Sequence, residues 1–161
     1  MVTIRAAVEG DRAAVWAVLE PVIRAGETYA LPRDLSVEDG LGYWFGAGNS
    51  VFVAEADGRV VGNYLLRANQ RGGGGHVANC GYMTAGDFVG RGVARAMCAH
   101  WLQVARERGF GAMQFNFVVS TNERAVRLWE SCGFEIVGQL PGAFAHPALG
   151  FVDALVMFRT L

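Results

Sequence analysis

The sequence predicts a mixed α/β fold of the α+β type with one central sheet, and three observations support this class. Hydrophobic residues follow strand or helix spacing in the order βααβββαβαββ, which gives seven strands and four helices. Three consecutive strands would form an antiparallel meander, whereas the step that follows resembles a parallel βαβ unit. The 161 residues, of which 52% are hydrophobic, suffice for one sizeable core. We therefore expect a single domain over residues 1–161.

The N-terminal half of the chain shows short strands and two helices. We predict strands over residues 2–6 and 76–84, two further strands between 50 and 68, and helices over 9–26 and 36–48. Asp57-Gly58 is a strong hairpin signal, because both residue types tolerate the positive φ of a two-residue turn. Ser36 followed by Asp39 is a weaker form of the capping box that begins a helix. Gly26 would end the first helix.

The C-terminal half alternates helices and strands. We predict helices over 92–109 and 120–133 and strands over 111–119, 134–140 and 150–158, with a loop at 141–149. Ser120 and Glu123 have capping-box spacing, and Gly109 and Gly133 would close the two helices. The four glycines at 72–75 indicate a loop, since no helix follows them to form a phosphate site.

Composition excludes several classes of protein. The net charge of −1 gives no basic footprint for nucleic acid or an anionic membrane. No apolar run approaches the roughly 18 residues of a membrane span, and Arg5 and Glu9 interrupt the N-terminus, so we expect no signal peptide. Cys80, Cys98 and Cys132 are odd in number and widely spaced, which indicates reduced thiols in a cytoplasmic protein. The three histidines have no metal-ligand spacing, so we expect no metal site.

The stretch "DFVGRGVARAM" places two glycines, Gly90 and Gly92, at the start of a predicted helix. The first amides of a helix lack partners and carry partial positive charge, and glycines let an anion approach them. Arg91 and Arg95 add charge nearby. This pattern favours a phosphate or diphosphate site, although a simple strand–helix turn would also use glycines. The Gly-Lys-Ser/Thr ending of a P-loop is absent, and Arg95 stands where a dinucleotide fingerprint needs glycine.

Two segments carry a family resemblance. "MTAGDFVGRGVARAM" resembles the acyl-CoA loop of the GNAT superfamily of N-acyltransferases, Gln/Arg-x-x-Gly-x-Gly/Ala. Gly92 and Ala94 match this pattern, and Val89 departs from it. About 30 residues later, "NERAVRLWESCGF" is similar to the family segment Asn-x-x-Ala-x-x-Leu-Tyr-x-x-x-Gly-Phe. The matching residues there are Asn122, Ala125, Leu128, Gly133 and Phe134.

This resemblance implies a GNAT-like fold, with a mostly antiparallel seven-stranded sheet flanked by about four helices, and acetyl-CoA as acyl donor. In that fold the fourth and fifth strands diverge, and the pantetheine arm lies between them like an additional strand. The implied cofactor contacts are Met83, Thr84, Val89, Gly90, Arg91, Gly92, Val93, Ala94, Arg95 and Asn122. Either Met83 or Thr84 would supply the amide that stabilises the developing oxyanion. Asn122 could also cap its helix.

The catalytic groups of the family are only partly present. The family often uses a tyrosine acid where this chain has Trp129, and an indole cannot supply a proton at useful cost. The usual glutamate positions fall near Ala78 and Phe117, which are not acidic. The remaining candidates are Tyr82, as acid or hydrogen-bond donor, and Asn79, which could hold a water. Tyr82 could instead be an aromatic residue of the core.

Loops that wall the acceptor side of this fold supply three further candidates, Glu27, Tyr29 and His146. Glu27 could anchor a substrate ammonium or act as a base, or be a solvated loop charge. His146 could contact substrate or simply precede Pro147 in a turn. The segments "TYALP" and "HPALGFVDALVM" are loosely similar to the branch of phosphinothricin-type small-molecule acetyltransferases.

We therefore expect an enzyme that moves the acetyl group of acetyl-CoA to a primary amine of a small molecule. A protein N-terminus or lysine is the alternative acceptor, and a non-catalytic acyl-CoA-binding module is the alternative class. The apolar strand surfaces could also support a homodimer.

Overall fold

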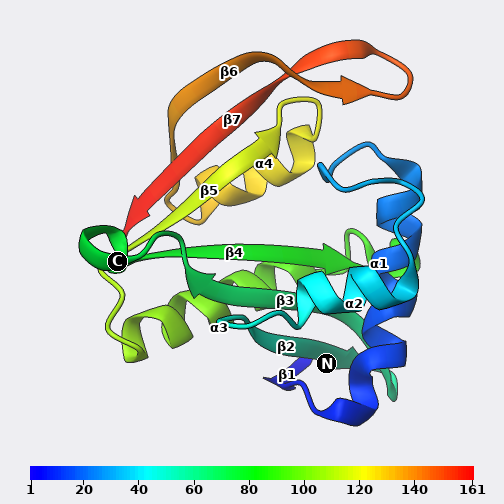
Figure 1. Cartoon of the computed structure of the whole chain (residues 1–161). Coiled ribbons are helices and arrows are strands. Elements are labelled where there is room, and N and C mark those ends of the chain that lie inside the picture. Colours follow the sequence, from blue (N-terminus) through cyan, green and yellow to red (C-terminus); the bar gives the residue numbers. More distant parts are fainter.

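The computed structural model describes all 161 residues as one seven-stranded sheet with four α-helices (Figure 1). The strand order is β1-β2-β3-β4-β5-β7-β6, and only the β4–β5 pair is parallel. The strands are β1 (Thr3–Ala6), β2 (Ser50–Ala56), β3 (Arg59–Ala68), β4 (Val77–Thr84), β5 (Ala112–Val119), β6 (Glu135–His146) and β7 (Gly150–Thr160). The helices are α1 (Arg12–Ala25), α2 (Val37–Trp44), α3 (Val93–Glu107) and α4 (Glu123–Ser131). The predicted fold class and element order are confirmed.

The sheet carries a hydrophobic core on each face. α1 and α2 cover one face, where Leu19 and Trp44 are buried against β2, β3 and β4. α3 and α4 cover the other face, where Met97, Trp101 and Trp129 are buried. Helical spacing of the apolar residues gives each helix one such buried stripe. None of the helices is long and apolar enough to cross a membrane.

Local signals in the sequence set most element ends. The Ser36 hydroxyl accepts the N–H of Asp39 (3.0 Å) at the start of α2, as predicted. Asp57 and Gly58 both have positive φ (52° and 76°) in the tight turn between β2 and β3. α4, however, begins two residues later than its capping-box pattern predicts, because Asn122 and not Ser120 caps it.

The strand β6 is longer than predicted. It runs to His146, through the segment that we expected to be a loop at 141–149. Proline has no N–H to donate, but β6 is an edge strand, so Pro141 can occupy it without breaking a ladder. A register shift between Leu140 and Phe144 absorbs the irregularity, and Gly142 adopts a positive φ of 58° there.

The strands β4 and β5 diverge soon after they begin. Their pairing is limited to Val77 with Ala112 and Ala78 with Met113. Figure 1 shows the two strands separating toward the ends that carry the loop before α3 and the start of α4. Because each strand keeps its partner on the other side, the backbone facing this opening is left without a ladder. The opening is therefore the natural place for a ligand.

Candidate active site

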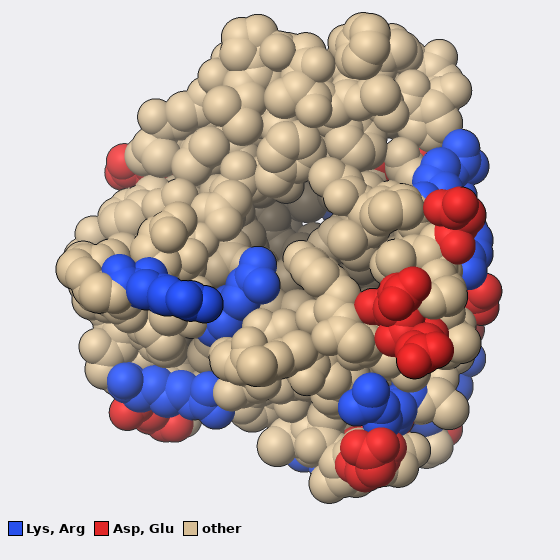
Figure 2. Space-filling model, in the orientation of Figure 1, with Lys and Arg blue, Asp and Glu red and all other residues tan.

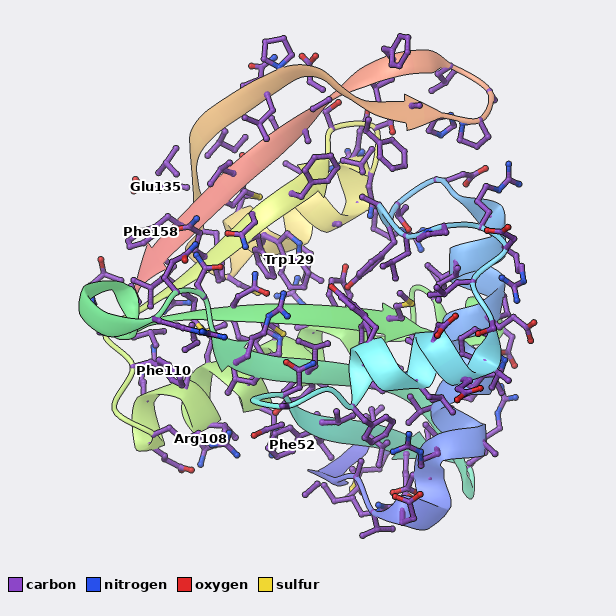
Figure 3. The ribbon with its side chains drawn as sticks, in the orientation of Figure 1. Phe52, Arg108, Phe110, Trp129, Glu135 and Phe158 are labelled. Atoms are coloured by element: carbon purple, nitrogen blue, oxygen red, sulfur yellow. The ribbon has the colours of Figure 1, made fainter.

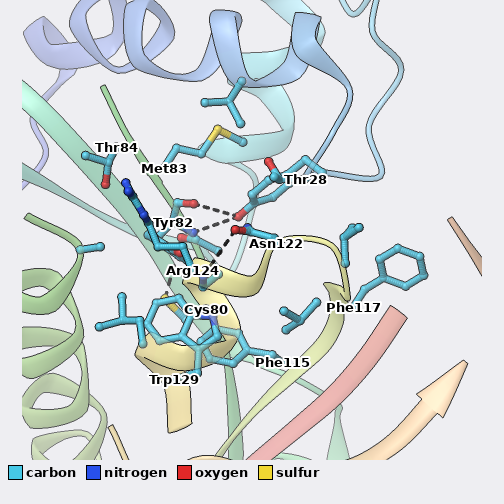
Figure 4. A pocket seen from close by; sticks show the side chains of 18 of the residues that line it. Thr28, Cys80, Tyr82, Met83, Thr84, Phe115, Phe117, Asn122, Arg124 and Trp129 are labelled. Atoms are coloured by element: carbon cyan, nitrogen blue, oxygen red, sulfur yellow. Dashed lines mark hydrogen bonds between the residues drawn. The ribbon is translucent and has the colours of Figure 1, made fainter. Parts of the chain in front are cut away.

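A cavity of about 800 Å³ occupies the opening between β4 and β5. Its walls come from these two strands, the starts of α3 and α4, and the loop between α1 and α2 (Figure 4). Of its 34 lining residues, 21 are hydrophobic, and none is an aspartate, glutamate or histidine. Figure 2 shows the hollow on this face, with basic side chains along one of its borders. The cavity can therefore hold a large, partly apolar and anionic ligand.

The backbone of β4 directs hydrogen-bonding groups into this cavity. The N–H of Ala85 donates to the carbonyl oxygen of Val61 (2.8 Å), which fixes the alternation of the β3–β4 ladder. Odd-numbered residues of β4 therefore bond to β3, and even-numbered residues turn their N–H and C=O groups toward β5. The amides of Tyr82 and Thr84 consequently face the cavity, whereas the amide of Met83 faces β3. Of the two expected oxyanion donors, Thr84 therefore faces the cavity and Met83 does not. The Tyr82 amide is already bonded to the hydroxyl of Tyr29.

Tyr29, in the loop between α1 and α2, joins this loop to β4. The N–H of Tyr82 donates to the Tyr29 hydroxyl (2.9 Å), and the hydroxyl donates to the Tyr82 carbonyl oxygen (3.3 Å). The Tyr29 ring also packs against Trp44, with 6.2 Å between ring centroids. Burial raises the pKa of Tyr29 well above its usual value, so its hydroxyl stays protonated at neutral pH. Tyr29, predicted as an acceptor contact, does line the cavity.

The loop before α3 presents unpaired amides. Gly90 and Gly92 have φ angles of 85° and 81°, in the left-handed region that favours glycine. The N–H groups of residues 93–95 have no acceptor in the protein, and Ala96 is the first to bond back, to the carbonyl oxygen of Gly92 (2.9 Å). A Cβ at Gly92 would meet no atom within 4 Å, so the space there is open. This geometry suits an anion at the helix N-terminus.

Tyr82 and Trp129 meet where β4 faces α4. Their rings are edge-on, with centroids 4.6 Å apart. Trp129 is only 1% exposed. Figure 3 shows Trp129 between α4 and β4. Burial raises the pKa of Tyr82 well above its usual value, so its hydroxyl stays protonated at neutral pH and can donate a hydrogen bond. Burial also raises the pKa of the Cys80 thiol, which therefore is no nucleophile.

Asn79 marks the point at which the two strands separate. Its side-chain amide donates to the carbonyl oxygen of Gln114 on β5 (2.9 Å), just beyond the last paired residues. It lines the cavity and is buried, with 8% exposure. Asn122 lies across the cavity at the start of α4, where its Oδ1 accepts the N–H of Ala125 (3.4 Å) and its Nδ2 remains free. Figure 4 shows Asn122 facing the strand that carries Tyr82.

Three residues named from the sequence lie outside the cavity lining. Glu27 is exposed, although Thr28 and Tyr29, which follow it, line the cavity. The Nδ1 atom of His146 accepts two backbone N–H groups of the turn between β6 and β7, at 3.1 and 3.2 Å. The guanidinium of Arg91 lies 4.7 Å over the ring of Phe88. These placements indicate that Glu27 is a solvated charge, that His146 stabilises a turn, and that Arg91 packs against an aromatic ring.

Three arginines that line the cavity were not predicted from the sequence: Arg67 on β3, and Arg124 and Arg127 on α4. The Arg124 guanidinium lies 4.0 Å from where a Cβ of Gly90 would stand, so it reaches the loop before α3. Its place two residues after Asn122 was a usable signal. Arg67 interrupts the apolar run of β3, but only the strand register shows which face it occupies.

Comparison with known proteins identifies the family of this fold and site. The model of the acetyltransferase (GNAT) family matches residues 18–134. The chain belongs to the GNAT acetyltransferase family. The predicted resemblance is therefore confirmed.

Several relatives of this GNAT protein are known. A GCN5-related N-acetyltransferase from Kribbella flavida, whose structure is known, is 40% identical in sequence to this chain. The alignment covers 99% of this chain and 98% of that chain, and the two structures superpose with a TM-score of 0.94. The L-amino acid N-acetyltransferase AaaT of Escherichia coli is 34% identical over 66% of this chain and 65% of its own. The chain spans about half to two thirds of the length of the curated relatives it matches. A phosphinothricin acetyltransferase from Sinorhizobium meliloti, solved in complex with AcCoA, shares the fold at 18% identity (TM-score 0.87; 99% of this chain, 88% of that chain).

The cavity residues of this GNAT protein fit the family's acyl donor, acetyl-CoA. The unpaired amides of residues 93–95 suit a diphosphate, and the guanidinium groups of Arg95 and Arg124 make no ion pair or hydrogen bond within the protein. The Oγ1 atom of Thr84 is buried without a hydrogen-bond partner. Such orphaned groups at the cavity wall are satisfied when a polar ligand binds.

Proposed function

We propose that this GNAT protein transfers the acetyl group of acetyl-CoA to the primary amine of a small molecule. The cavity between β4 and β5 carries this proposal, because it extends from the free amides before α3 to the space beneath the α1–α2 loop. The Tyr29 hydroxyl holds the α1–α2 loop against β4 beside that space, which favours a small acceptor over a protein chain. The name of the Escherichia coli relative, an L-amino acid N-acetyltransferase, supports an acceptor of this size.

The chain's own backbone would hold the donor. The amides of residues 93–95 would bind its diphosphate, supported by Arg95 and Arg124. The even-numbered residues of β4, apart from Tyr82, would bond to its pantetheine arm as an edge strand bonds to an added strand. When bound, acetyl-CoA supplies the activated acetyl group. The amide of Thr84 would then donate to the carbonyl oxygen on which charge develops.

Proton movement would rely on the acceptor itself, and Tyr82 would supply a hydrogen bond. The Tyr82 hydroxyl keeps its proton at neutral pH and would donate a hydrogen bond to the departing thiolate. A thiolate leaves readily because thiol pKa values are about 8.5, so this donation adds only modestly to the rate. No lining residue is an aspartate, glutamate or histidine, so the amine would arrive neutral or lose its proton to water.

A non-catalytic acyl-CoA-binding module is the second candidate. It is favoured by one observation, the lack of any base in the cavity together with Trp129 at the position of the family's tyrosine. The two candidates share the cofactor and differ only in turnover.

The first experiment is a melting curve with acetyl-CoA, CoA, ATP and NAD in separate samples. A ligand at about 100 times its Kd adds about 2.7 kcal/mol, which raises the Tm by several degrees. We expect a shift with acetyl-CoA and CoA alone, followed by thiol release when small amines are added. A shift without turnover of small amines or of peptides with free N-termini would support the binding module. No shift with either CoA species would overturn both candidates.

We also propose a cytoplasmic location and a homodimer. All three cysteines are free thiols, which supports a reducing compartment. The edge strand β6 exposes Ile136, Val137 and Leu140, and no charged residue occurs from 136 to 152. A second copy covering this edge would bury that apolar surface. Sedimentation of the wild type and of a Val137→Lys variant tests the dimer, which we expect only for the wild type.

A further inference from the structure

Arg67 lies in a different part of the cavity from the other arginines. It pairs with Asn79 across the β3–β4 ladder, five residues before the end of β4 at Thr84. At 3.3–3.4 Å per residue, its position lies roughly 17 Å along the strand from the loop before α3. By the alternation of β3 its side chain shares the face of Leu65, which is buried against α1 and α2. Arg67 thus faces the side of the sheet on which an acceptor would bind.

The charge of Arg67 has no partner. The protein contains six ion pairs, and Arg67 takes part in none of them and makes no hydrogen bond. No acidic side chain lines the cavity to neutralise it. Arg127, by contrast, is paired with Glu123 (2.9 Å), and Arg95 and Arg124 lie beside the loop that suits the diphosphate. Arg67 is half-buried, so its charge is only partly solvated.

The polar side chains nearest to Arg67 in the sheet are neutral amides, Asn79 opposite it on β4 and Asn69 two residues later in the chain. The side-chain amide of Gln114 donates to Asn116 (2.9 Å), which donates to Asn69 (2.7 Å). Asn79 is held by the backbone of Gln114 (2.9 Å). This network orders the wall of the cavity but supplies no negative charge. A half-buried guanidinium in such a setting attracts a planar anion that can accept two parallel hydrogen bonds.

We propose that Arg67 binds a carboxylate of the acceptor, so that the substrates are amines that also carry a carboxylate, as α-amino acids do. This inference rests on the proposed acetyl transfer. The absence of acidic lining residues fits it further, because a second ammonium group on the acceptor would find no partner. Amino acids with apolar side chains suit the mostly hydrophobic lining, and diamines do not.

The test compares acceptors that differ only in the carboxylate. L-leucine and L-phenylalanine are measured against isoamylamine and phenethylamine by thiol release, at equal concentrations of neutral amine. The proteins are the wild type, Arg67→Gln, Arg67→Lys and the control Arg71→Gln, which removes an exposed arginine outside the cavity lining. A melting curve with acetyl-CoA verifies that each variant folds and binds the cofactor.

We expect the wild type and Arg71→Gln to prefer the amino acids by about 10–100-fold in kcat/KM, the size of one charge-assisted pair. Arg67→Gln should bring this ratio close to one, and Arg67→Lys should leave an intermediate ratio, because lysine keeps the charge without the bidentate geometry. Equal or better turnover of the decarboxylated amines by the wild type would overturn the role of Arg67 while supporting acetyl transfer. Absence of turnover with either class, despite a cofactor shift, would overturn both.

Discussion

The hydroxyl of Tyr29 is hydrogen-bonded to both backbone groups of Tyr82, accepting its N–H at 2.9 Å and donating to its C=O at 3.3 Å. These are backbone groups of β4 that face the opening toward β5. One side chain from the α1–α2 loop therefore holds the loop against the strand that would contact the donor. That contact would couple the proposed acceptor wall of this GNAT protein to its proposed donor site.

Replacing Tyr29 by phenylalanine should release the loop while keeping the aromatic packing on Trp44. Loss of the two hydrogen bonds should lower the free energy of unfolding by about 1 kcal/mol, seen as a fall in Tm of several degrees. Hydrogen exchange should speed up in the loop between α1 and α2 and at the amide of Tyr82. Tyr43→Phe is the control, because the Tyr43 hydroxyl makes no hydrogen bond and the side chain is 43% exposed. Equal rates of hydrogen exchange in both variants would show that the two hydrogen bonds of Tyr29 do not stabilise the loop.

Gly92→Glu should abolish binding of acetyl-CoA and leave the fold intact. The new side chain finds open space, but it brings negative charge to the amides that suit the diphosphate. The positive φ of 81° adds strain of about 1–2 kcal/mol to any substitution, so Gly92→Ala serves as the strain control. Gly86→Glu carries the same charge outside the cavity lining. Thermal shift with CoA should vanish only in Gly92→Glu, and a retained shift there would remove the loop from the cofactor site.

The ion pair between Arg5 and Asp11 should make stability fall in acid. Arg5 donates two hydrogen bonds to the Asp11 carboxylate (2.7 and 2.9 Å), and the N–H of Val8 donates a third (2.7 Å). The hydrogen bond from Arg5 is the main cause of the lowered pKa of Asp11. This stabilisation is complete above the unfolded-state pKa of about 3.9 and is lost as pH falls through the lower folded-state pKa.

Asp11→Asn should therefore lower the free energy of unfolding by about 1–3 kcal/mol at pH 7, measured by urea titration. Below pH 4 the difference from the wild type should shrink. Glu9→Gln is the control, because the Glu9 side chain is 88% exposed and its contact with Arg12 adds little. A constant difference from pH 7 to pH 2 would contradict the role assigned to the carboxylate.

Features that depend on neighbouring residues were predictable, and features that depend on register were not. The turn at Asp57-Gly58 and the glycines at 90 and 92 follow from local backbone preferences, and both are found. The face of the sheet that Arg67 occupies could be assigned only from the register of β3 against β4. A slip of one residue would turn its side chain to the other face. Pro141 predicts the end of a strand when the place of that strand in the sheet is unknown. β6 lies at the edge of the sheet, and an edge strand tolerates proline.

The loop between α1 and α2 shows the same division. The sequence led us to predict that the segment around Glu27 and Tyr29 forms part of the acceptor wall, but periodicity does not fix which side chain of a loop turns inward. Tyr29 is directed inward because its ring packs on Trp44 and its hydroxyl is hydrogen-bonded to β4. Glu27 has no such partner and is exposed. Tertiary contacts therefore determine which side chain of this loop points inward.

The pH dependence of turnover should be set by the acceptor and not by the protein. No aspartate, glutamate or histidine lines the cavity, and burial raises the pKa values of the lining Tyr29, Tyr82 and Cys80. None of these groups gains or loses a proton between pH 6 and 9, so only the neutral fraction of the amine changes. An alkylammonium has a pKa of about 10.4, and its neutral fraction rises tenfold per pH unit below that value. We expect log kcat/KM to rise with a slope of about one and to level off near the pKa of each amine. Two acceptors of different pKa should therefore level off at different pH values. A common midpoint for both would reveal a titrating base on the protein and would place one in the acceptor wall after all.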